Sequence, residues 1–190
     1  MNNLSDSQVQ QLVTGHETYG KKVSDHYDEL LEQVIRRVDS SGSLGKAEIA
    51  ALSFWKRLNA NTRWASALLV RPDAEVHAVT ARVVAAARDR SVPTPDAASA
   101  ALELLAVLPG FKARGPLASA VLLAAAPDRM AVYDRRARAG LARIDCPLVG
   151  TSRVYVRYIT LVETLADQVN ARGYQWTARD VDKALYWLGG

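Results

Sequence analysis

The sequence predicts an all-α fold, a compact helical domain divided into two lobes, and two observations support this. Apolar residues recur every three or four positions over most of the chain, which is the spacing of one face of an α-helix. No stretch shows the alternation of apolar and polar residues that marks a half-buried strand. The chain has 190 residues, 49 % of them hydrophobic, which is enough for a single domain, 1–190, with its own core.

The first predicted helices follow one another closely. The range 24–38 carries one apolar stripe, and the glycine- and serine-rich run 40–45 ends it. Helices are expected next at 46–58 and 62–70. A fourth, 72–88, opens on a proline with two acidic residues in its first turn, which suits a helix start.

The next helices have equally clear boundaries. Thr94 is expected to cap a helix that runs to Leu108, with Pro95 in its first position. Apolar residues spaced at i, i+3, i+4 and i+7 predict a helix over 116–126, and another is expected over 134–144.

The C-terminal part completes a count of about nine helices. The range 151–171 keeps one apolar face throughout. Thr177 is expected to cap the last helix, with Asp180 as its capping-box partner. Residues 1–23 are assigned to an N-terminal segment that is free to be flexible.

The composition excludes several classes of protein. Cys146 is the only cysteine, which excludes an intrachain disulfide framework, an iron–sulfur cluster and a four-cysteine zinc site. The three histidines are scattered, so we expect no metal site. No signal-peptide pattern opens the chain, and no apolar run reaches the roughly 20 residues needed to cross a bilayer. We therefore expect a soluble, cytoplasmic protein without a membrane partner.

The charges are distributed unevenly along the chain. Residues 108–157 contain nine basic and three acidic residues, whereas residues 1–45 contain seven acidic and four basic residues. Such segregation suggests a basic face for a polyanion. An arginine-rich composition also arises from the base composition of a gene, and that explanation stays open.

The stretch "LPGFKARGPLA", 108–118, concentrates this charge in the connection between two apolar helices. Gly110 and Gly115 allow positive φ and a close approach of the backbone. Lys112 and Arg114 add full positive charges, and the next helix presents its free N–H groups toward the loop. The predicted motif is a helix-hairpin-helix that binds a phosphate backbone, and the alternative is a solvated loop between helices.

The segments "LPGFKARGPLASAVL" and "MAVYDRRARAGL" resemble the signature of the helix-hairpin-helix DNA glycosylase superfamily, most closely its 8-oxoguanine branch. The resemblance covers about residues 100–144. It implies that the hairpin grips double-stranded DNA and that a modified purine flips into a pocket between the lobes. It also implies that Asp134 assists cleavage of the N-glycosidic bond. Arg135 and Arg136 directly follow Asp134, so we expect their charges to keep it ionised and to bind flanking phosphates.

Pro116 stands where bifunctional members of that family carry a catalytic lysine. The resemblance therefore implies a monofunctional glycosylase, a hydrolase that uses water. An ungapped alignment places Arg114 at the lysine position instead, and Lys112 offers an amine from the longer loop. The family often holds a monovalent cation at the hairpin carbonyls, which makes such a cation the one cofactor to consider here.

Aromatic side chains are expected to wall the pocket for a flipped base. By analogy with the 8-oxoguanine branch, the last helix supplies Trp187 or Tyr186, and Tyr158 is a third candidate. Further candidates are Trp55, Trp64, Tyr155 and Trp176, most of which are expected in the core.

Other interpretations remain open at this stage. Asp134 could serve only as a helix cap. The scaffold could be a non-catalytic module that binds DNA or a protein partner, in repair or in antiphage defence, or a glycosidase acting on a free nucleoside or nucleotide. The sequence does not identify a protein partner.

Overall fold

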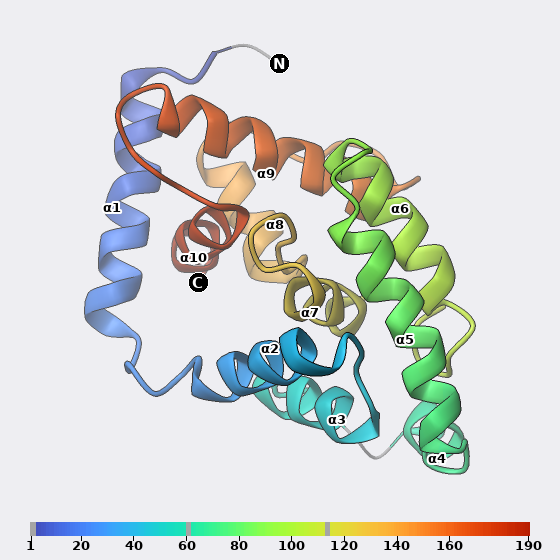
Figure 1. Cartoon of the computed structure of the whole chain (residues 1–190). Helices are drawn as coiled ribbons and strands as arrows, with labels where there is room; N and C mark the ends of the chain where they lie inside the picture. Colours follow the sequence, from blue (N-terminus) through green and yellow to red (C-terminus); the bar gives the residue numbers. More distant parts are fainter. Residues whose placement is uncertain (1–2, 60–61, 113–114) are drawn as a thin grey trace.

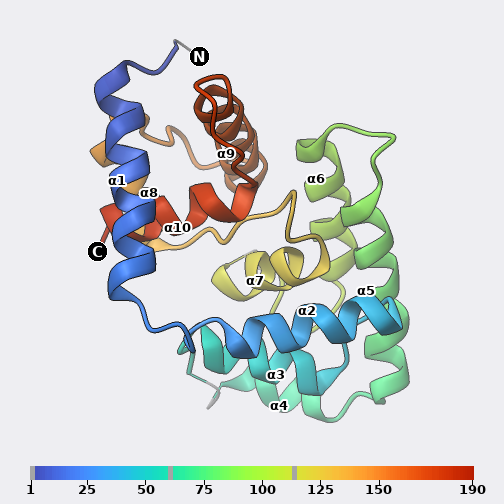
Figure 2. The same ribbon diagram turned by 60° about the vertical axis from the view of Figure 1, so that its left-hand side comes forward.

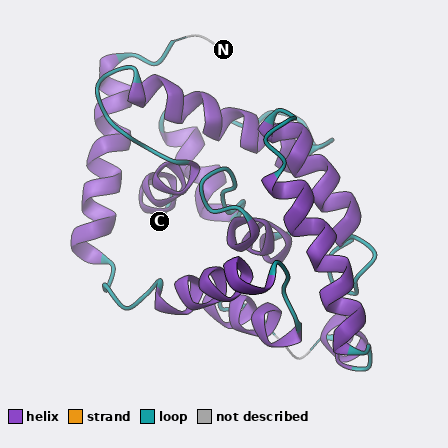
Figure 3. Cartoon of the chain, viewed as in Figure 1, coloured by secondary structure: helices purple, strands orange, loops and turns teal. Residues whose placement is uncertain are grey.

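The computed structural model describes residues 3–59, 62–112 and 115–190, and this part of the chain is all-helical, with no strand (Figure 3). Its ten helices are α1 (Asp6–Lys22), α2 (Glu29–Ser41), α3 (Lys46–Trp55), α4 (Arg63–Leu69), α5 (Asp73–Arg88), α6 (Thr94–Leu105), α7 (Pro116–Ala125), α8 (Arg135–Arg143), α9 (Val154–Asn170) and α10 (Ala178–Leu188). The predicted all-α class is confirmed.

The N-terminal segment contains a helix that the sequence analysis did not expect. Ser5 accepts a hydrogen bond from the Gln8 amide, and the Gln8 side chain accepts one from the Ser5 amide, so a capping box starts α1. Leu12 is fully buried, and α1 packs against α10, which it crosses (Figure 2). Residues 6–22 are therefore part of the packed body of the molecule.

The helices pack in two groups (Figures 1 and 2). In one group α7 contacts α2, α3, α5 and α6, and every residue from Leu117 to Ala125 is buried. In the other group α10 contacts α1, α8 and α9. The contact of α6 with α9 joins the two groups.

The predicted helix ends were correct at some positions and wrong at others. Thr177 and Asp180 form the predicted capping box of α10. Thr94, in contrast, does not cap α6, because Pro93 is the N-cap residue. The Thr94 hydroxyl instead donates to Glu163 Oε1 at 2.8 Å, which ties the start of α6 to α9.

Close backbone contact fixes α8 against α10. A Cβ placed on Gly140 would lie 2.3 Å from the Leu185 carbonyl oxygen. Only glycine permits this approach, since any side chain would force the helices apart. The contact sets the position of α8 and of Asp134, which immediately precedes it.

None of the described helices combines the length and apolar character needed to span a bilayer.

Candidate functional site

Asp134 is the N-cap residue of α8 and accepts two hydrogen bonds from different parts of the chain. Its Oδ1 accepts from the Ala137 amide at 2.9 Å, as expected of a helix cap. Its Oδ2 accepts from Lys56 Nζ at 2.6 Å. The two side chains are only 16 % and 10 % exposed, so this ion pair is largely shielded from water.

The surroundings of Asp134 keep its carboxylate charged. Burial raises the pKa of Asp134, but the Lys56 ammonium and the donated hydrogen bonds lower it by more. The net pKa lies below the ordinary value of an aspartate, so the group is ionised at neutral pH. A fixed carboxylate of this kind can stabilise positive charge developing beside it.

Asp134 also lines a cavity of about 580 Å³ formed where several helices begin. Gly115 and Pro116 reach it from the start of α7, and Arg135 and Arg138 reach it from α8. The other lining residues are Leu102, Tyr133, Thr151, Arg153, Val154, Tyr155 and Val156. The structure thus places Asp134 and Pro116, which are 18 positions apart, at one cavity.

Lys56 is the functional candidate that the sequence analysis missed. It is the C-cap residue of α3, 78 positions before Asp134, and its ammonium lies 5.3 Å from the centre of the Trp55 ring. No local pattern links residues so far apart. A lysine amine is therefore paired with Asp134, although Lys56 is not among the described residues that line the cavity.

The connection between α6 and α7 holds the residues predicted to grip DNA. Lys112 is exposed, as that role requires. Gly110 has the predicted positive φ of +93°, and the Trp64 ring packs against it. Gly115 does not have the predicted positive φ. Its φ is −81°, and it serves as the N-cap residue of α7. Arg114 lies outside the described residues.

The hairpin motif itself stays a prediction. Helices α6 and α7 contact each other, and Phe111 anchors the connection in the core. The described part of the connection stops at Lys112 and resumes at Gly115. A monovalent cation bound by the carbonyls of this connection also stays a prediction.

The two arginines after Asp134 point in different directions. Arg135 lines the cavity. The Arg136 guanidinium lies over the Tyr186 ring, 4.5 Å from its centre, and Arg136 is not among the described residues that line the cavity. Of these two arginines, only Arg135 therefore lies beside the cavity that Asp134 faces.

The three aromatic residues proposed for the base pocket are not among the described residues that line this cavity. Tyr158 is fully buried, and its ring centre lies 5.2 Å from that of Tyr133. The Tyr186 hydroxyl accepts from Arg57 at 3.2 Å, and Trp187 is partly buried in α10. The aromatic rings that do line the cavity are Tyr133 and Tyr155.

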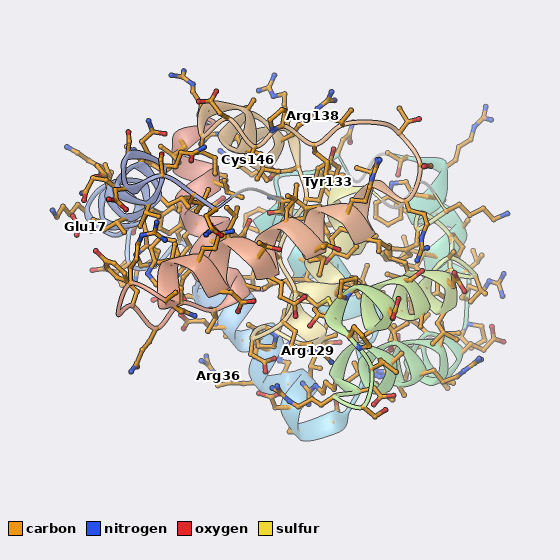
Figure 4. The ribbon with its side chains drawn as sticks, turned by 90° about the horizontal axis from the view of Figure 1, so that it is seen from above. Glu17, Arg36, Arg129, Tyr133, Arg138 and Cys146 are labelled. Carbon is orange, nitrogen blue, oxygen red and sulfur yellow. The ribbon has the colours of Figure 1, made fainter. Side chains whose placement is uncertain are left out.

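The basic residues of 108–157 do not form one continuous face. Arg129 donates to the carbonyls of Asp89 at 2.7 Å and Val92 at 3.0 Å, and so holds the loop between α5 and α6. Figure 4 shows Tyr133 and Arg138 toward one side of the molecule and Arg129 toward the other. Arg129 therefore contributes to structure away from the cavity.

Within the described part of the chain, no three His, Cys, Asp or Glu side chains gather in an arrangement that could hold a metal ion. Comparisons with protein-family models, with curated proteins and with solved structures found no match to this chain.

Proposed function

We propose that the protein binds double-stranded DNA and hydrolyses the N-glycosidic bond of a modified purine such as 8-oxoguanine. The observation that supports this is the position of Asp134, an ionised carboxylate at the edge of a cavity that also contains the start of α7. A volume of about 580 Å³ is in the range of small-molecule sites. The exposed Lys112 supplies a contact to the DNA backbone outside the cavity.

The proposed reaction needs only water as a co-reactant. As the bond between the sugar C1′ and the purine nitrogen breaks, the base leaves with the electron pair and the sugar gains positive charge. Asp134 stabilises that charge, and a water oxygen adds to C1′. One water proton goes to the departing base, and the product is an abasic site. Pro116 has no amine, so the hairpin itself offers no covalent route.

A non-catalytic DNA- or partner-binding module is the second candidate. The observation that favours it is that both Asp134 oxygens already accept hydrogen bonds, from Lys56 and Ala137. A carboxylate with a cap and an ion pair has a structural role even without catalysis. The two candidates differ in what they predict for base excision.

The test is a panel of duplex oligonucleotides, each with one modified purine, assayed for abasic sites. The glycosylase proposal expects wild type to excise at least one base. Asp134→Asn keeps a capping oxygen but removes the charge, so excision should fall about a hundredfold or more while duplex binding persists. Lys112→Ala should weaken duplex binding and make it less dependent on salt.

The alternative outcome is equally clear. If wild type and Asp134→Asn bind the duplexes alike and neither excises any base, the protein is a binding module. Binding that Lys112→Ala leaves unchanged at every salt concentration would remove the connection between α6 and α7 from the DNA interface.

A further inference from the structure

Three arginines surround the cavity beside Asp134. Arg135 and Arg138 come from the first turns of α8, and Arg153 is the N-cap residue of α9. Within the described part of the chain, the side chains of Arg135 and Arg138 form no hydrogen bond or ion pair, and the side chain of Arg153 forms one hydrogen bond, to Ser99 Oγ at 3.5 Å. All three side chains are exposed. They are therefore available to a ligand.

The cavity has a surplus of positive charge. Three arginines line it, and Asp134 is the one carboxylate among its described lining residues. A second cavity of about 580 Å³ lies against Cys146 and the N-terminal segment, and its described lining contains no lysine or arginine. Another hollow, of about 270 Å³, is lined by Arg88, Arg90 and Arg129, but Arg88 is paired with Asp39, Arg90 with Asp128, and Arg129 donates to backbone carbonyls. Among the described residues, arginines with neither an ion pair nor a backbone acceptor therefore distinguish the Asp134 cavity from these two hollows.

The backbone at the cavity adds to this charge. Neither the N-cap residue of α7, Gly115, nor that of α9, Arg153, offers a side-chain acceptor to its helix. The first N–H groups of both helices, and the positive ends of their dipoles, thus adjoin the cavity. The wall between the arginines is apolar, with Tyr133, Tyr155 and Val154 contributing to it.

We propose that Arg135, Arg138 and Arg153 form a subsite for a phosphate group of the nucleotide whose base and sugar occupy this cavity. Guanidinium groups match phosphate oxygens with paired N–H donors, and the apolar wall suits the uncharged part of a nucleotide. This proposal deepens the proposed function, since it places the substrate phosphate relative to Asp134. The phosphate comes either from a free mononucleotide or from the linkage beside a flipped nucleotide.

Calorimetric titration at low salt tests the subsite with two pairs of probes. The first pair is 2′-deoxyguanosine 5′-monophosphate and 2′-deoxyguanosine. The second is a duplex with one modified purine, either with native linkages or with a neutral methylphosphonate beside that purine. The variants are Arg138→Glu and Arg153→Glu. The control is Arg143→Glu, an equal charge change at the far end of α8 and outside the described cavity lining.

The phosphate-bearing probe of at least one pair should bind about tenfold or more tightly than its neutral partner. Arg138→Glu and Arg153→Glu should remove that advantage, whereas Arg143→Glu should keep it. Tighter binding of the phosphate-bearing probe in the first pair identifies a free mononucleotide as the source of the phosphate. Tighter binding in the second pair alone identifies the linkage beside a flipped nucleotide as the source. Equal binding within both pairs, or an equal loss with Arg143→Glu, overturns the subsite.

Asp134→Asn separates this proposal from the catalytic one. It should leave the phosphate-dependent binding intact. If phosphate-dependent binding requires the arginines while wild type excises no base, the proposal of base excision is wrong and the proposal of a phosphate subsite is supported. Excision that proceeds equally well in Arg138→Glu and Arg153→Glu overturns the subsite and leaves catalysis standing.

Discussion

At the residue scale, Asp134 combines a local contact with a distant one. Its hydrogen bond from the Ala137 amide caps α8, and its ion pair with Lys56 links α8 to the end of α3. A largely buried pair of this kind costs desolvation energy, so its net value depends on both partners being present. Removal of one partner leaves a charge without compensation.

Lys56→Met should therefore lower the free energy of unfolding by about 1–3 kcal/mol at neutral pH. The folded-state pKa of Asp134 is lowered, so the pair contributes its full stabilisation above the ordinary pKa of aspartate, about 4. This contribution disappears as the pH falls through the lower, folded-state pKa. The difference in the free energy of unfolding between wild type and Lys56→Met should therefore become smaller as the pH falls. Denaturant unfolding from pH 7 down to about pH 2 measures this difference.

Lys21→Met is the control, because Lys21 is exposed and forms no ion pair within the described part of the chain. It should change stability only slightly at any pH. A stability loss in Lys56→Met that is the same at both ends of the pH range would contradict an ionic role for Lys56.

At the scale of elements, the contact of α8 with α10 determines where the cavity forms. Gly140 brings α8 against the backbone of α10 at Leu185. Because α8 carries Arg135 and Arg138 and begins after Asp134, a small shift of this helix moves three cavity residues together. Packing at Gly140 is thus coupled to the geometry of the site.

Gly140→Ala should destabilise the protein by about 3 kcal/mol, because its Cβ would overlap backbone atoms that cannot move independently. Gly20→Ala in α1 is the matched control, since a Cβ there meets nothing within 4 Å. It should be neutral or stabilising by up to about 1 kcal/mol. Denaturation midpoints of both variants measure the effect, and equal midpoints would show that the α8–α10 contact has room for a methyl group.

At the scale of the whole molecule, a second ionic contact joins the two groups of helices. Arg179 of α10 donates to Asp182 on its own helix and to Asp28 Oδ2, at 2.7 Å, before α2. Trp55 of α3 donates to the other oxygen of Asp28 at 3.2 Å. Together with the pair of Lys56 and Asp134, this network fixes α2 and α3 against α8 and α10.

Arg179→Met should destabilise the protein by about 3 kcal/mol, because it leaves two largely buried carboxylates without their cation. Burial already raises the pKa of Asp182 despite the lowering effect of Arg179, and loss of Arg179 should raise it further. A raised folded-state pKa costs stability above the ordinary pKa, so the defect should grow as pH rises from about 4 to 7. Urea unfolding at several pH values measures this.

Asp182→Asn in the Arg179→Met background provides the internal check. Removing the carboxylate should restore part of the lost stability at neutral pH. A further, additive loss would show that Asp182 does not depend on Arg179 for its charge.

Local patterns were sufficient for most of the helices and for part of the site. Apolar periodicity predicted α2 through α10, and a short-range pattern predicted the cap at Thr177. The α1 helix was missed although Ser5 and Gln8 had the spacing of a capping box. Asp134 could be predicted because both a helix cap and the family motif are defined by a few neighbouring residues.

The partner of Asp134 and the composition of the cavity depend on how distant segments pack. Lys56 is 78 positions from Asp134, and the cavity draws residues from α6, α7, α8, α9 and the segments before them. Periodicity shows which face of a helix is buried but not which helix it meets. That choice depends on contacts such as Gly140 against Leu185, whose energies arise only when the whole chain is folded.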